Sequence, residues 1–338
     1  MLENMVLKIK LIQILLTCIL LTLFIPVLLV SFGFSFDQGS SAKDMSIPCT
    51  KIVCPPCLNE RKDVISTESE VIPKPSHKLA LIVPVRDRLE ELLEFIPYMK
   101  KFLGNQGVTS EILVINQGDG YRFNRASLIN SGFRLMKQHC PDCDYFAMHD
   151  VDLLPLNPEL KYSYPEHGPL HLAAPHLHPK YHYDKFVGGI LLLTISQFEL
   201  VNGMSNRYWG WGLEDDEFYV RLKQANITIQ RPGNLTTDST NTFKHMHNAR
   251  VRKRDYRYCY DQKKASLRRD YDSGVNNVNF KVVGQYSVTS NGESATLFNI
   301  HLECDRTFSP WCLCPEDIPK PKNVTSKSGK VKQPHKIS

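Results

Sequence analysis

The stretch Asp144-Tyr-Phe-Ala-Met-His149-Asp150-Val-Asp152 places an unbroken apolar run directly before two carboxylates. A short run of this kind is typical of a strand that is buried on both faces. Two similar runs come earlier, Leu79-Ala-Leu-Ile-Val-Pro84 and Glu111-Ile-Leu-Val-Ile-Asn116, and residues 88–103 and 124–136, between the three runs, carry apolar side chains at helical spacing. Strands that alternate with helices predict an α/β fold with a mostly parallel central sheet and right-handed crossovers.

Polar residues follow these strands at the position where open α/β sheets bind ligands, outside the carboxyl ends of the strands. Asp150 and Asp152 stand two residues apart and can converge on a cation or a ribose, although an isolated Asp-x-Asp is often only a turn. Arg86 and Arg88 follow the first strand, and Arg125 opens the second helix. Guanidinium groups suit phosphate and uracil-type oxygens, and ordinary ion pairing with nearby acids is the alternative interpretation.

Two histidines supply a candidate metal site. His245 and His247 lie two residues apart, so on an extended segment both imidazoles point to the same face. With Asp152 they offer the two nitrogens and one carboxylate that suit a divalent first-row metal with open positions for phosphate oxygens. Manganese fits this donor set, and the residues alone do not separate it from cobalt, iron or zinc. A pair of surface histidines is the alternative.

The segment from Tyr208 to Tyr219 combines aromatic rings, glycines and acids. Trp209 and Trp211 alternate with Gly210 and Gly212 and run into four consecutive carboxylates, Glu214 to Glu217. Indole faces stack on sugars, glycine lets a ligand approach the backbone, and a carboxylate can take a proton from a sugar hydroxyl. The segment therefore predicts a sugar platform with a general base. A solvated acidic helix start is the alternative.

Tyrosines near the middle of the chain form a second, weaker candidate. His182, flanked by Tyr181 and Tyr183, precedes Gly188-Gly189 and could line an acceptor groove, although tyrosines before an apolar run are more often part of a core. From about residue 160 onward the sequence loses its regular periodicity.

The N-terminal part of this 338-residue chain predicts a membrane anchor. Residues 11–34 are almost wholly apolar and exceed the roughly 20 residues that span a bilayer as a helix. Lys8 and Lys10 on the N-terminal side favour a cytosolic tail at residues 1–10, with the rest of the chain on the other side. A cleaved signal peptide is the alternative. We expect a luminal stem at 35–77, a single catalytic domain at 78–318 and a disordered basic tail at 319–338.

Cysteines and glycosylation motifs agree with an oxidising compartment. Cys54 and Cys57, like Cys140 and Cys143, are spaced as redox or zinc pairs, but structural disulfides are favoured in a secretory protein. Cys304 and Cys312 predict another local bridge. Nine cysteines follow the apolar run, so one is left over, with Cys49 and Cys259 as candidates. Glycosylation motifs begin at Asn226, Asn234 and Asn323.

The net charge of +6 is modest and comes largely from Lys and Arg at 252–269 and from the tail. A basic segment behind a membrane anchor argues against nucleic acid as a partner and favours sugar phosphates or acidic glycans.

In their order along the chain, four motifs resemble the β-1,4-galactosyltransferase family over roughly residues 78–314. They are Val83-Pro-Val-Arg-Asp-Arg88, Phe123-Asn-Arg-Ala126, Asp150-Val-Asp152 and Trp209-Gly-Trp-Gly-Leu-Glu-Asp-Asp-Glu217. Five further segments resemble the branch of that family that galactosylates xylose on proteoglycan core proteins. They are Tyr181-His-Tyr183, Val187-Gly-Gly-Ile190, His245-Met-His247, Arg252-Lys-Arg-Asp255 and the segment from Cys304 to Cys312.

The resemblance implies a GT-A-type nucleotide-sugar-binding fold, UDP-galactose as donor, Mn²⁺ as cofactor and residence in the Golgi membrane as a single-pass type II protein. It assigns the metal to Asp152, His245 and His247, the general base to Asp215 and acceptor steering to Glu214. The nucleotide sugar would contact Pro84, Val85, Arg86, Asp87, Arg88, Phe123, Asn124, Arg125, Asp150, Val151, Asp152, Gly189, Trp211, His245, Met246, His247 and Arg254. The acceptor would contact Tyr181, Tyr183, Trp211, Gly212, Leu213, Glu214, Asp215 and Asp216.

The expected function is inverting transfer of galactose to the 4-hydroxyl of xylose on proteoglycan core proteins, with the loops around Trp211 and after His247 closing on the donor. Val85, Phe186 and Leu213 depart from the family pattern and leave the acceptor contacts open. The alternatives are a relative that acts on N-acetylglucosamine or glucose, and a glycan-binding protein without catalysis. A thiol oxidoreductase is a weaker one.

Overall fold

The computed structural model describes residues 77–318. The expected anchor at 11–34, the stem up to residue 76 and the tail at 319–338 lie outside the described residues, as do Cys49, Cys54, Cys57 and Asn323. Within residues 77–318 no helix is long and apolar enough to cross a bilayer.

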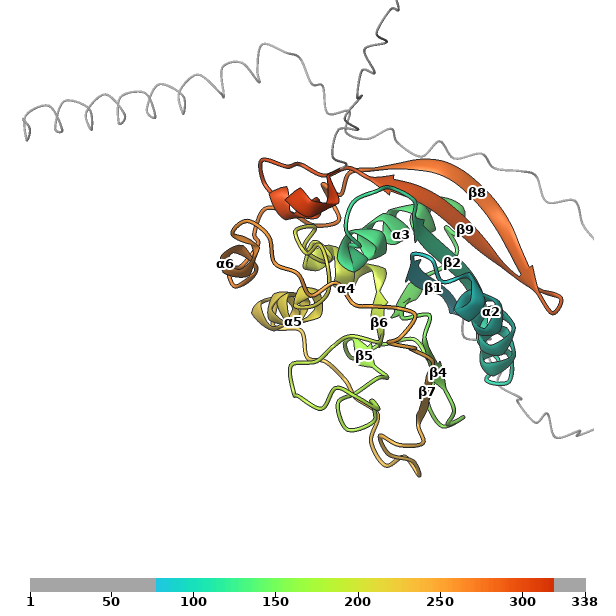
Figure 1. Ribbon diagram of the computed structural model, residues 1–338. Helices are drawn as coiled ribbons and strands as arrows, with labels where there is room; N and C mark the ends of the chain where they lie inside the picture. The colour runs from blue at the N-terminus through green and yellow to red at the C-terminus, as the bar shows by residue number, and fades with distance from the viewer. Residues whose placement is uncertain (1–76, 319–338) are drawn as a thin grey trace, which may run out of the picture. The chain divides into compact units, whose positions relative to one another are not determined.

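A seven-stranded sheet in the order β5-β6-β3-β1-β2-β9-β8 forms the centre of the domain (Figure 1). Its parallel part consists of β3, β1, β2 and β9, and the remaining pairs are antiparallel. The strands are β1 (Lys78–Val85), β2 (Thr109–Gln117), β3 (Tyr145–His149), β5 (Leu170–His171), β6 (Ile190–Thr194), β8 (Phe280–Ser290) and β9 (Glu293–Leu302). The prediction of an α/β fold with a mostly parallel central sheet is confirmed.

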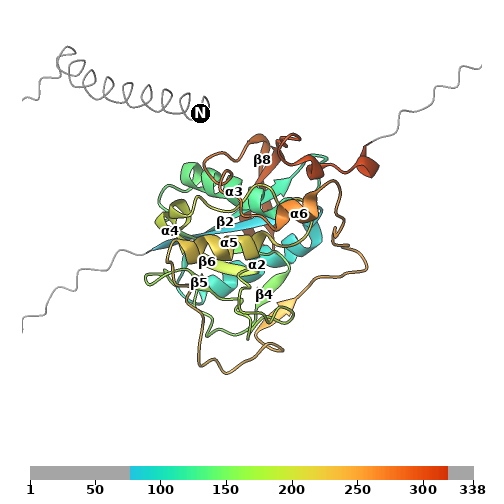
Figure 2. The same cartoon turned by 90° about the vertical axis from the view of Figure 1, so that its left-hand side faces the viewer.

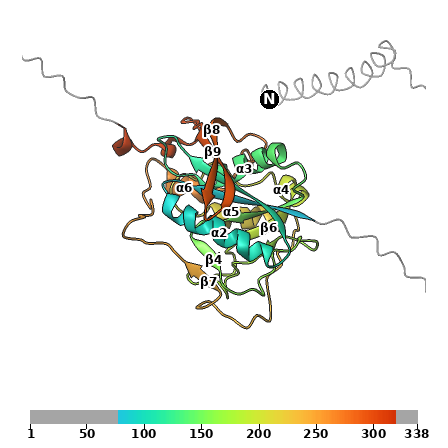
Figure 3. The same ribbon diagram turned by 90° about the vertical axis from the view of Figure 1, so that its right-hand side faces the viewer.

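Helices cover both faces of this sheet because successive side chains of a strand point to opposite sides. In β1, Ala80 and Ile82 pack in one core with α3 (Arg125–His139), α4 (Ile195–Leu200) and α5 (Glu214–Gln224). Leu79 and Leu81 pack in the other with α2 (Leu89–Gly104), which Figure 3 shows beside the β8–β9 hairpin. The two predicted helices therefore lie on opposite faces of the sheet.

Gly132 brings α3 close to the sheet. A Cβ at this position would lie 2.5 Å from Ile82 Cγ2 and 2.9 Å from Ile115 Cγ1. Any larger residue would push the helix away from β1 and β2. The N-terminus of α3 would move with it, and that end carries Arg125.

The second half of the chain contains strands that the sequence analysis did not predict. The run Ile190–Thr194 forms β6 antiparallel to β3, and β8 and β9 form a long hairpin. The hairpin turn is Asn291-Gly292, with φ values of 49° and 81°. This dipeptide is the strongest short-range signal for a two-residue hairpin loop.

A small second sheet pairs β4 (Leu153–Pro155) with β7 (Phe243–His245). It brings the His245 segment beside Asp152, whose carbonyl accepts a hydrogen bond from the backbone of Met246 at 2.7 Å. From β7 the chain runs along one side of the domain to α6 (Gln262–Ser266), as Figure 2 shows. The short helices η1 (Pro310–Cys312) and η2 (Pro315–Asp317) close the described chain.

Three disulfides are present among the described residues: Cys140–Cys143, Cys304–Cys312 and Cys259–Cys314. The first two confirm the predicted local bridges. The third corrects the prediction that Cys259 is a candidate for the unpaired thiol, because Cys259 pairs with a cysteine 55 positions later.

Candidate active site

A cavity of about 570 Å³ lies where β1, β3 and β7 end and α5 begins. It brings together most of the residues that the sequence singled out. They are Pro84, Val85, Arg86, Asp87, Arg88, Phe123, Arg125, Asp150, Val151, Asp152, Tyr181, Tyr183, Gly189, Trp211, Gly212, Leu213, Glu214, Asp215, Asp216, His245, His247 and Arg254. Asn124 and Met246 are not among its lining residues. Asn124 is fully buried and caps α3, where its side chain accepts a hydrogen bond from the backbone of Ser127 at 2.9 Å.

The first turn of α5 presents three carboxylates to this cavity. Leu213 before it has φ 72°, a left-handed conformation that turns the chain into the helix. Burial raises the pKa of Asp215 to about 8, with the negative charges of Glu214 and Asp216 adding to the shift. Burial also raises the pKa of Glu214, against the opposing charge of Arg125. The segment is thus an acidic helix start, as the alternative interpretation had it, but its acids line a cavity.

Arg125 lies between Asp150, which follows β3, and Glu214, which begins α5. Its Nε donates to Asp150 Oδ1 at 2.7 Å, and its Nη1 lies 3.9 Å from Glu214 Oε1. Asp150 is therefore held by an arginine at hydrogen-bond distance, whereas the guanidinium of Arg88 lies 3.7 Å from Asp152 Oδ2.

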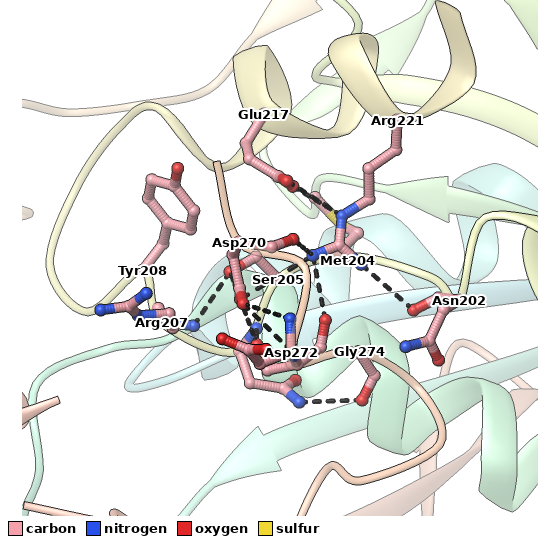
Figure 4. Close-up of polar contacts among 12 residues, drawn as sticks. Asn202, Met204, Ser205, Arg207, Tyr208, Glu217, Arg221, Asp270, Asp272 and Gly274 are labelled. Atoms are coloured by element: carbon pink, nitrogen blue, oxygen red, sulfur yellow. Dashed lines mark hydrogen bonds and ion pairs between the residues drawn. The ribbon is translucent and has the colours of Figure 1, made fainter. Parts of the chain in front are cut away.

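Helix α5 is fixed from behind by the buried Arg221 (Figure 4). Its Nε donates to both carboxylate oxygens of Glu217, at 3.0 and 2.9 Å, and its Nη2 donates to the carbonyls of Asp270 and Ser273 at 3.0 and 2.9 Å. The carboxylate of Asp270 in turn accepts hydrogen bonds from the hydroxyls of Ser205 and Ser273. This network sets the direction in which the first turn of α5 faces the cavity.

The candidate metal ligands Asp152, His245 and His247 line the same cavity. His247 Nδ1 lies 3.3 Å from Asp152 Oδ2, and the rings of His245 and His247 are nearly parallel with centroids 5.8 Å apart. Burial lowers the pKa of both histidines, against the opposing charge of Asp152. Neutral imidazole is the form that binds metal, so the donor set fits a divalent first-row ion.

The three ligand atoms are not yet gathered around one point. In the described part of the chain, only one group of His, Cys, Asp or Glu side chains has three possible ligand atoms within 4.8 Å of one another. It consists of Cys140, Asp142 and Cys143, and the two cysteines form a disulfide. Since Asp152 and His247 lie close to each other, His245 is the candidate ligand that lies further from the other two.

Three rings and one cation that line the cavity lie against one another; we call this group the Trp211 wall, formed by Trp211, Arg254, Tyr181 and Tyr256. The guanidinium of Arg254 lies 4.8 Å from the Trp211 ring centroid and 5.9 Å from that of Tyr181. Tyr256 meets the indole edge-on at 4.8 Å. The expectation of a platform built from two tryptophans is wrong in one respect, because Trp209 is only 4% exposed and packs in the core.

The remaining arginines near the cavity are already paired. Arg86 donates to the carbonyls of Gln117, Asp119 and Tyr121, and Arg88 to Glu91 Oε1 at 2.9 Å. Arg88 also lies 3.7 Å from Asp152 Oδ2. The contacts of Arg86 and Arg88 thus agree with the alternative interpretation, in which these arginines pair with nearby groups of the protein. Arg254, in contrast, makes no ion pair with any described residue.

Several cavity residues were missed by sequence reasoning. His178 lines the cavity, and its Nδ1 accepts hydrogen bonds from the backbones of Lys180 and Tyr181, both at 3.0 Å. Burial lowers its pKa to about 4, so this imidazole is neutral. The pattern His176-Leu-His178 was the available signal. Leu153, Val251, Tyr256 and Tyr258 are further lining residues that the sequence analysis did not single out. Phe186, Gly188, Gly210, Arg252, Lys253 and Asp255 also line the cavity and belong to segments that it named.

A parallel α/β sheet with a carboxylate-and-histidine site, an arginine-rich rim and a helix-borne carboxylate with a raised pKa defines a nucleotide-sugar glycosyltransferase. Comparison with known proteins then identifies the family. Residues 57–165 match the N-terminal region of glycosyl transferase group 7, and residues 168–247 match the N-terminal domain of galactosyltransferase. The chain belongs to the β-1,4-galactosyltransferase family.

Two relatives illustrate the similarity. Beta-1,4-galactosyltransferase 7 of Drosophila melanogaster is 53% identical over 239 residues, which are 70% of this chain and 73% of the relative. Xylosylprotein 4-beta-galactosyltransferase of Caenorhabditis elegans is 50% identical over 240 residues, 70% of this chain and 82% of the relative.

Solved structures of the Drosophila enzyme agree with the fold. Its catalytic domain in complex with xylobiose superposes with a TM-score of 0.68 at 53% identity, covering 70% of this chain and 99% of the other. A variant of the same enzyme in complex with manganese, UDP-Gal and xylobiose has the same TM-score and identity, covering 70% and 98%.

Proposed function

We propose that this protein transfers galactose from UDP-galactose to the 4-hydroxyl of xylose on proteoglycan core proteins, with inversion at the anomeric carbon. The observation that carries the proposal is the placement of Asp215 and Trp211 in a cavity that Asp152, His245 and His247 also line. The Drosophila relative, crystallised with xylobiose and, as a variant, with manganese, UDP-Gal and xylobiose, supports this choice of donor, acceptor and metal.

In this mechanism Asp215 takes the proton of the acceptor hydroxyl. The freed oxygen attacks the anomeric carbon, and the bond between that carbon and the diphosphate breaks as the new bond forms. Manganese held by Asp152, His245 and His247 would supply positive charge to the diphosphate. Arg254 on the Trp211 wall adds a fixed cation on the donor side, so that stabilisation is mainly electrostatic. Glu214 in the same helical turn is placed to hold a second acceptor hydroxyl.

Closure of two segments would complete the site. Residues 251–256 and Tyr258 line the cavity together with Trp211, and the backbone of Trp211 donates to the carbonyl of Asp255 at 2.9 Å. We propose that both segments close over the donor and exclude the water that would hydrolyse it.

Transfer from UDP-galactose to a β-xyloside, with and without manganese, tests the proposal in wild type and Asp215→Asn. We expect wild type to transfer galactose only when manganese is present. In Asp215→Asn the transfer rate should fall by about 1,000-fold or more, because the variant lacks its base, while the affinity for the donor should be nearly unchanged. Preference for an N-acetylglucosaminide or glucoside acceptor would favour the family's other acceptor class. Absence of any transfer despite donor and acceptor binding would favour a glycan-binding protein.

We also propose that the protein resides in the Golgi membrane as a single-pass type II protein, anchored by residues 11–34. The flanking Lys8 and Lys10 support this orientation. Asn226 and Asn234, which begin two of the glycosylation motifs, are exposed. Alkaline extraction should leave the protein in the membrane fraction. Glycosidase treatment should change its mobility, and the change should disappear in a variant with both asparagines and Asn323 replaced by Gln.

A further inference from the structure

A buried guanidinium outside the cavity joins two of the three segments that form the Trp211 wall, the one that carries Trp211 and the one that carries Arg254 and Tyr256. The side chain of Arg122, between β2 and α3, is only 2% exposed. Its Nε donates to Asp255 Oδ2 at 2.6 Å, its Nη1 to Gln262 Oε1 at 2.7 Å and its Nη2 to the carbonyl of Arg257 at 2.8 Å. A buried cation is stable only when its donors are used in this way.

The contacts of Arg122 lead directly to the wall. Asp255 follows Arg254, and its carbonyl accepts the hydrogen bond from the Trp211 backbone at 2.9 Å. Gln262 also donates to the carbonyl of Trp209 at 2.8 Å. One guanidinium thus holds, through Asp255 and Gln262, the backbone N–H of Trp211 and the carbonyl of Trp209.

Gly210 lets the Trp211 segment lie against this guanidinium. Its φ is 91°, and a Cβ at this position would lie 2.2 Å from Arg122 Nη2. Its backbone N–H donates to the carbonyl of Phe123 at 2.9 Å. The glycine between the two tryptophans is therefore required by Arg122 as well as by any ligand.

We propose that Arg122 is a positioning residue, which through Asp255 fixes the indole of Trp211 against Arg254 and so aligns the donor and acceptor sides of the cavity. For the chemical roles of Trp211 and Arg254, the inference rests on the proposed function. The alignment itself is a property of the protein and can be measured without turnover.

The charge of Asp255 is central to this coupling. Burial alone would raise its pKa, but hydrogen bonds from Arg257 and Arg122 hold the pKa well below its usual range. Arg257 Nε donates to Asp255 Oδ1 at 2.9 Å, so the carboxylate keeps one cationic partner when Arg122 is removed. Substitution of Arg122 should therefore loosen the wall while the domain stays folded.

Collisional quenching of tryptophan fluorescence by acrylamide measures how accessible Trp211 is to solvent. The chain has three tryptophans; Trp211 is 43% exposed, whereas Trp209 and Trp311 are 4% and 2% exposed. The quenching constant of the full-length protein therefore reports almost entirely on the wall. We expect it to rise in Arg122→Met and Asp255→Asn, and to be no higher in the double variant than in Arg122→Met alone. Arg122→Lys, which keeps a charge for Asp255, should lie between wild type and Arg122→Met.

Arg221→Met is the matched control, because Arg221 is equally buried but contacts neither side of the wall. It should lower the melting temperature without changing the quenching constant. An unchanged constant in both Arg122→Met and Asp255→Asn, or an equal rise in Arg221→Met, would overturn the proposal.

Kinetics provide the functional readout. In Asp255→Asn we expect kcat for transfer to fall about 10- to 100-fold, as misplacement of a positioning group commonly causes, with a smaller change in donor affinity. The ratio of donor hydrolysis to transfer should rise, because a loosened wall admits water. If wild type transfers no galactose to a xyloside, the proposed function fails, and the quenching comparison still decides the role of Arg122.

Discussion

At the scale of single residues, the site depends on a carboxylate whose proton affinity the fold has changed. Asp215 stands between Glu214 and Asp216 at the start of α5, with its side chain against the Gly188 backbone. Burial and the two neighbouring charges together raise its pKa to about 8, which is where a general base at neutral pH is most effective. The neighbouring carboxylates of Glu214 and Asp216 therefore help to bring the pKa of the proposed base close to neutral pH.

This tuning predicts the pH dependence of transfer. Only the deprotonated carboxylate accepts a proton, so kcat/KM, which reports the free enzyme, should rise with pH and level off above about 8. Asp216→Asn removes one of the negative charges that raise the pKa, and the midpoint should move to lower pH. Glu293→Gln, at the exposed β8–β9 turn, should leave the midpoint unchanged. A rate that is independent of pH across this range would exclude Asp215 as the base.

The same shift predicts a gain in stability when Asp215 is removed. Its pKa rises on folding from an ordinary value of 3.8 to about 8. Between these values the folded protein keeps a proton that the unfolded chain has released, so the free energy of unfolding falls as pH rises through this window. Asp215→Asn cannot lose a proton, and its melting temperature should exceed that of wild type increasingly between about pH 5 and pH 9. A constant difference across this range would contradict the shift.

At the scale of elements, α5 must be held rigidly for its first turn to face the cavity. Arg221 does this from the other end of the helix, through Glu217 on α5 and through backbone carbonyls of the segments around Asn202 and Asp270. The last of these segments lies beyond α6, so one side chain joins α5 to the chain that follows α6.

Arg221→Met should lower the free energy of unfolding by about 3–5 kcal/mol, because it leaves Glu217 and Asp270 buried without their cation. Chemical denaturation measures the change. Arg134→Met is the comparison: Arg134 is exposed on α3 and donates one hydrogen bond, to the carbonyl of Val278 at 2.9 Å. Loss of this hydrogen bond should lower the free energy of unfolding by about 1 kcal/mol. Equal effects of the two substitutions would mean that the network around Arg221 contributes little.

Elements whose signal lies in their own residues were predictable from the sequence. β1, β2 and β3 are continuous apolar runs, and α3 has an amide cap before its periodic face, so their positions were found within a few residues. β6 is an equally apolar run, but it follows two glycines in an irregular region. β9 joins the sheet beside β2, about 180 residues away along the chain, and only tertiary packing determines such a pairing.

Residues of the candidate site were likewise predictable where the signal lies in their own short motif. Asp152, His245 and Asp215 belong to short motifs whose chemistry can be recognised locally. Arg122 has no motif of its own, because its role comes from partners more than 130 positions away at Asp255 and Gln262. Trp209 was misassigned because alternation with glycine does not tell which of two indoles faces the core.

At the scale of the whole molecule, the C-terminal segment is the part of the described chain that ties the cavity's flanking loop to the sheet. Cys259 in that loop is bonded to Cys314, and Cys312 is bonded to Cys304, which follows β9. The backbone N–H of Arg122 donates to the carbonyl of Cys312 at 2.9 Å. The disulfides therefore connect the central sheet, Arg122 and the loop that carries Arg254.

The three disulfides should stabilise the protein unequally. In the chain-entropy model a bridge contributes more when it closes a longer loop, about 4 kcal/mol for Cys259–Cys314 and about 1.6 kcal/mol for Cys140–Cys143. Replacing both cysteines of each bridge by serine and measuring the free energy of unfolding tests this order. The Cys259–Cys314 double variant should also lose transfer activity below its melting temperature, since its loop carries Arg254. The Cys140–Cys143 variant, whose bridge lies at the turn between α3 and β3, should keep its activity. Equal activity in the two variants would show that the cavity wall holds its position without the longer bridge.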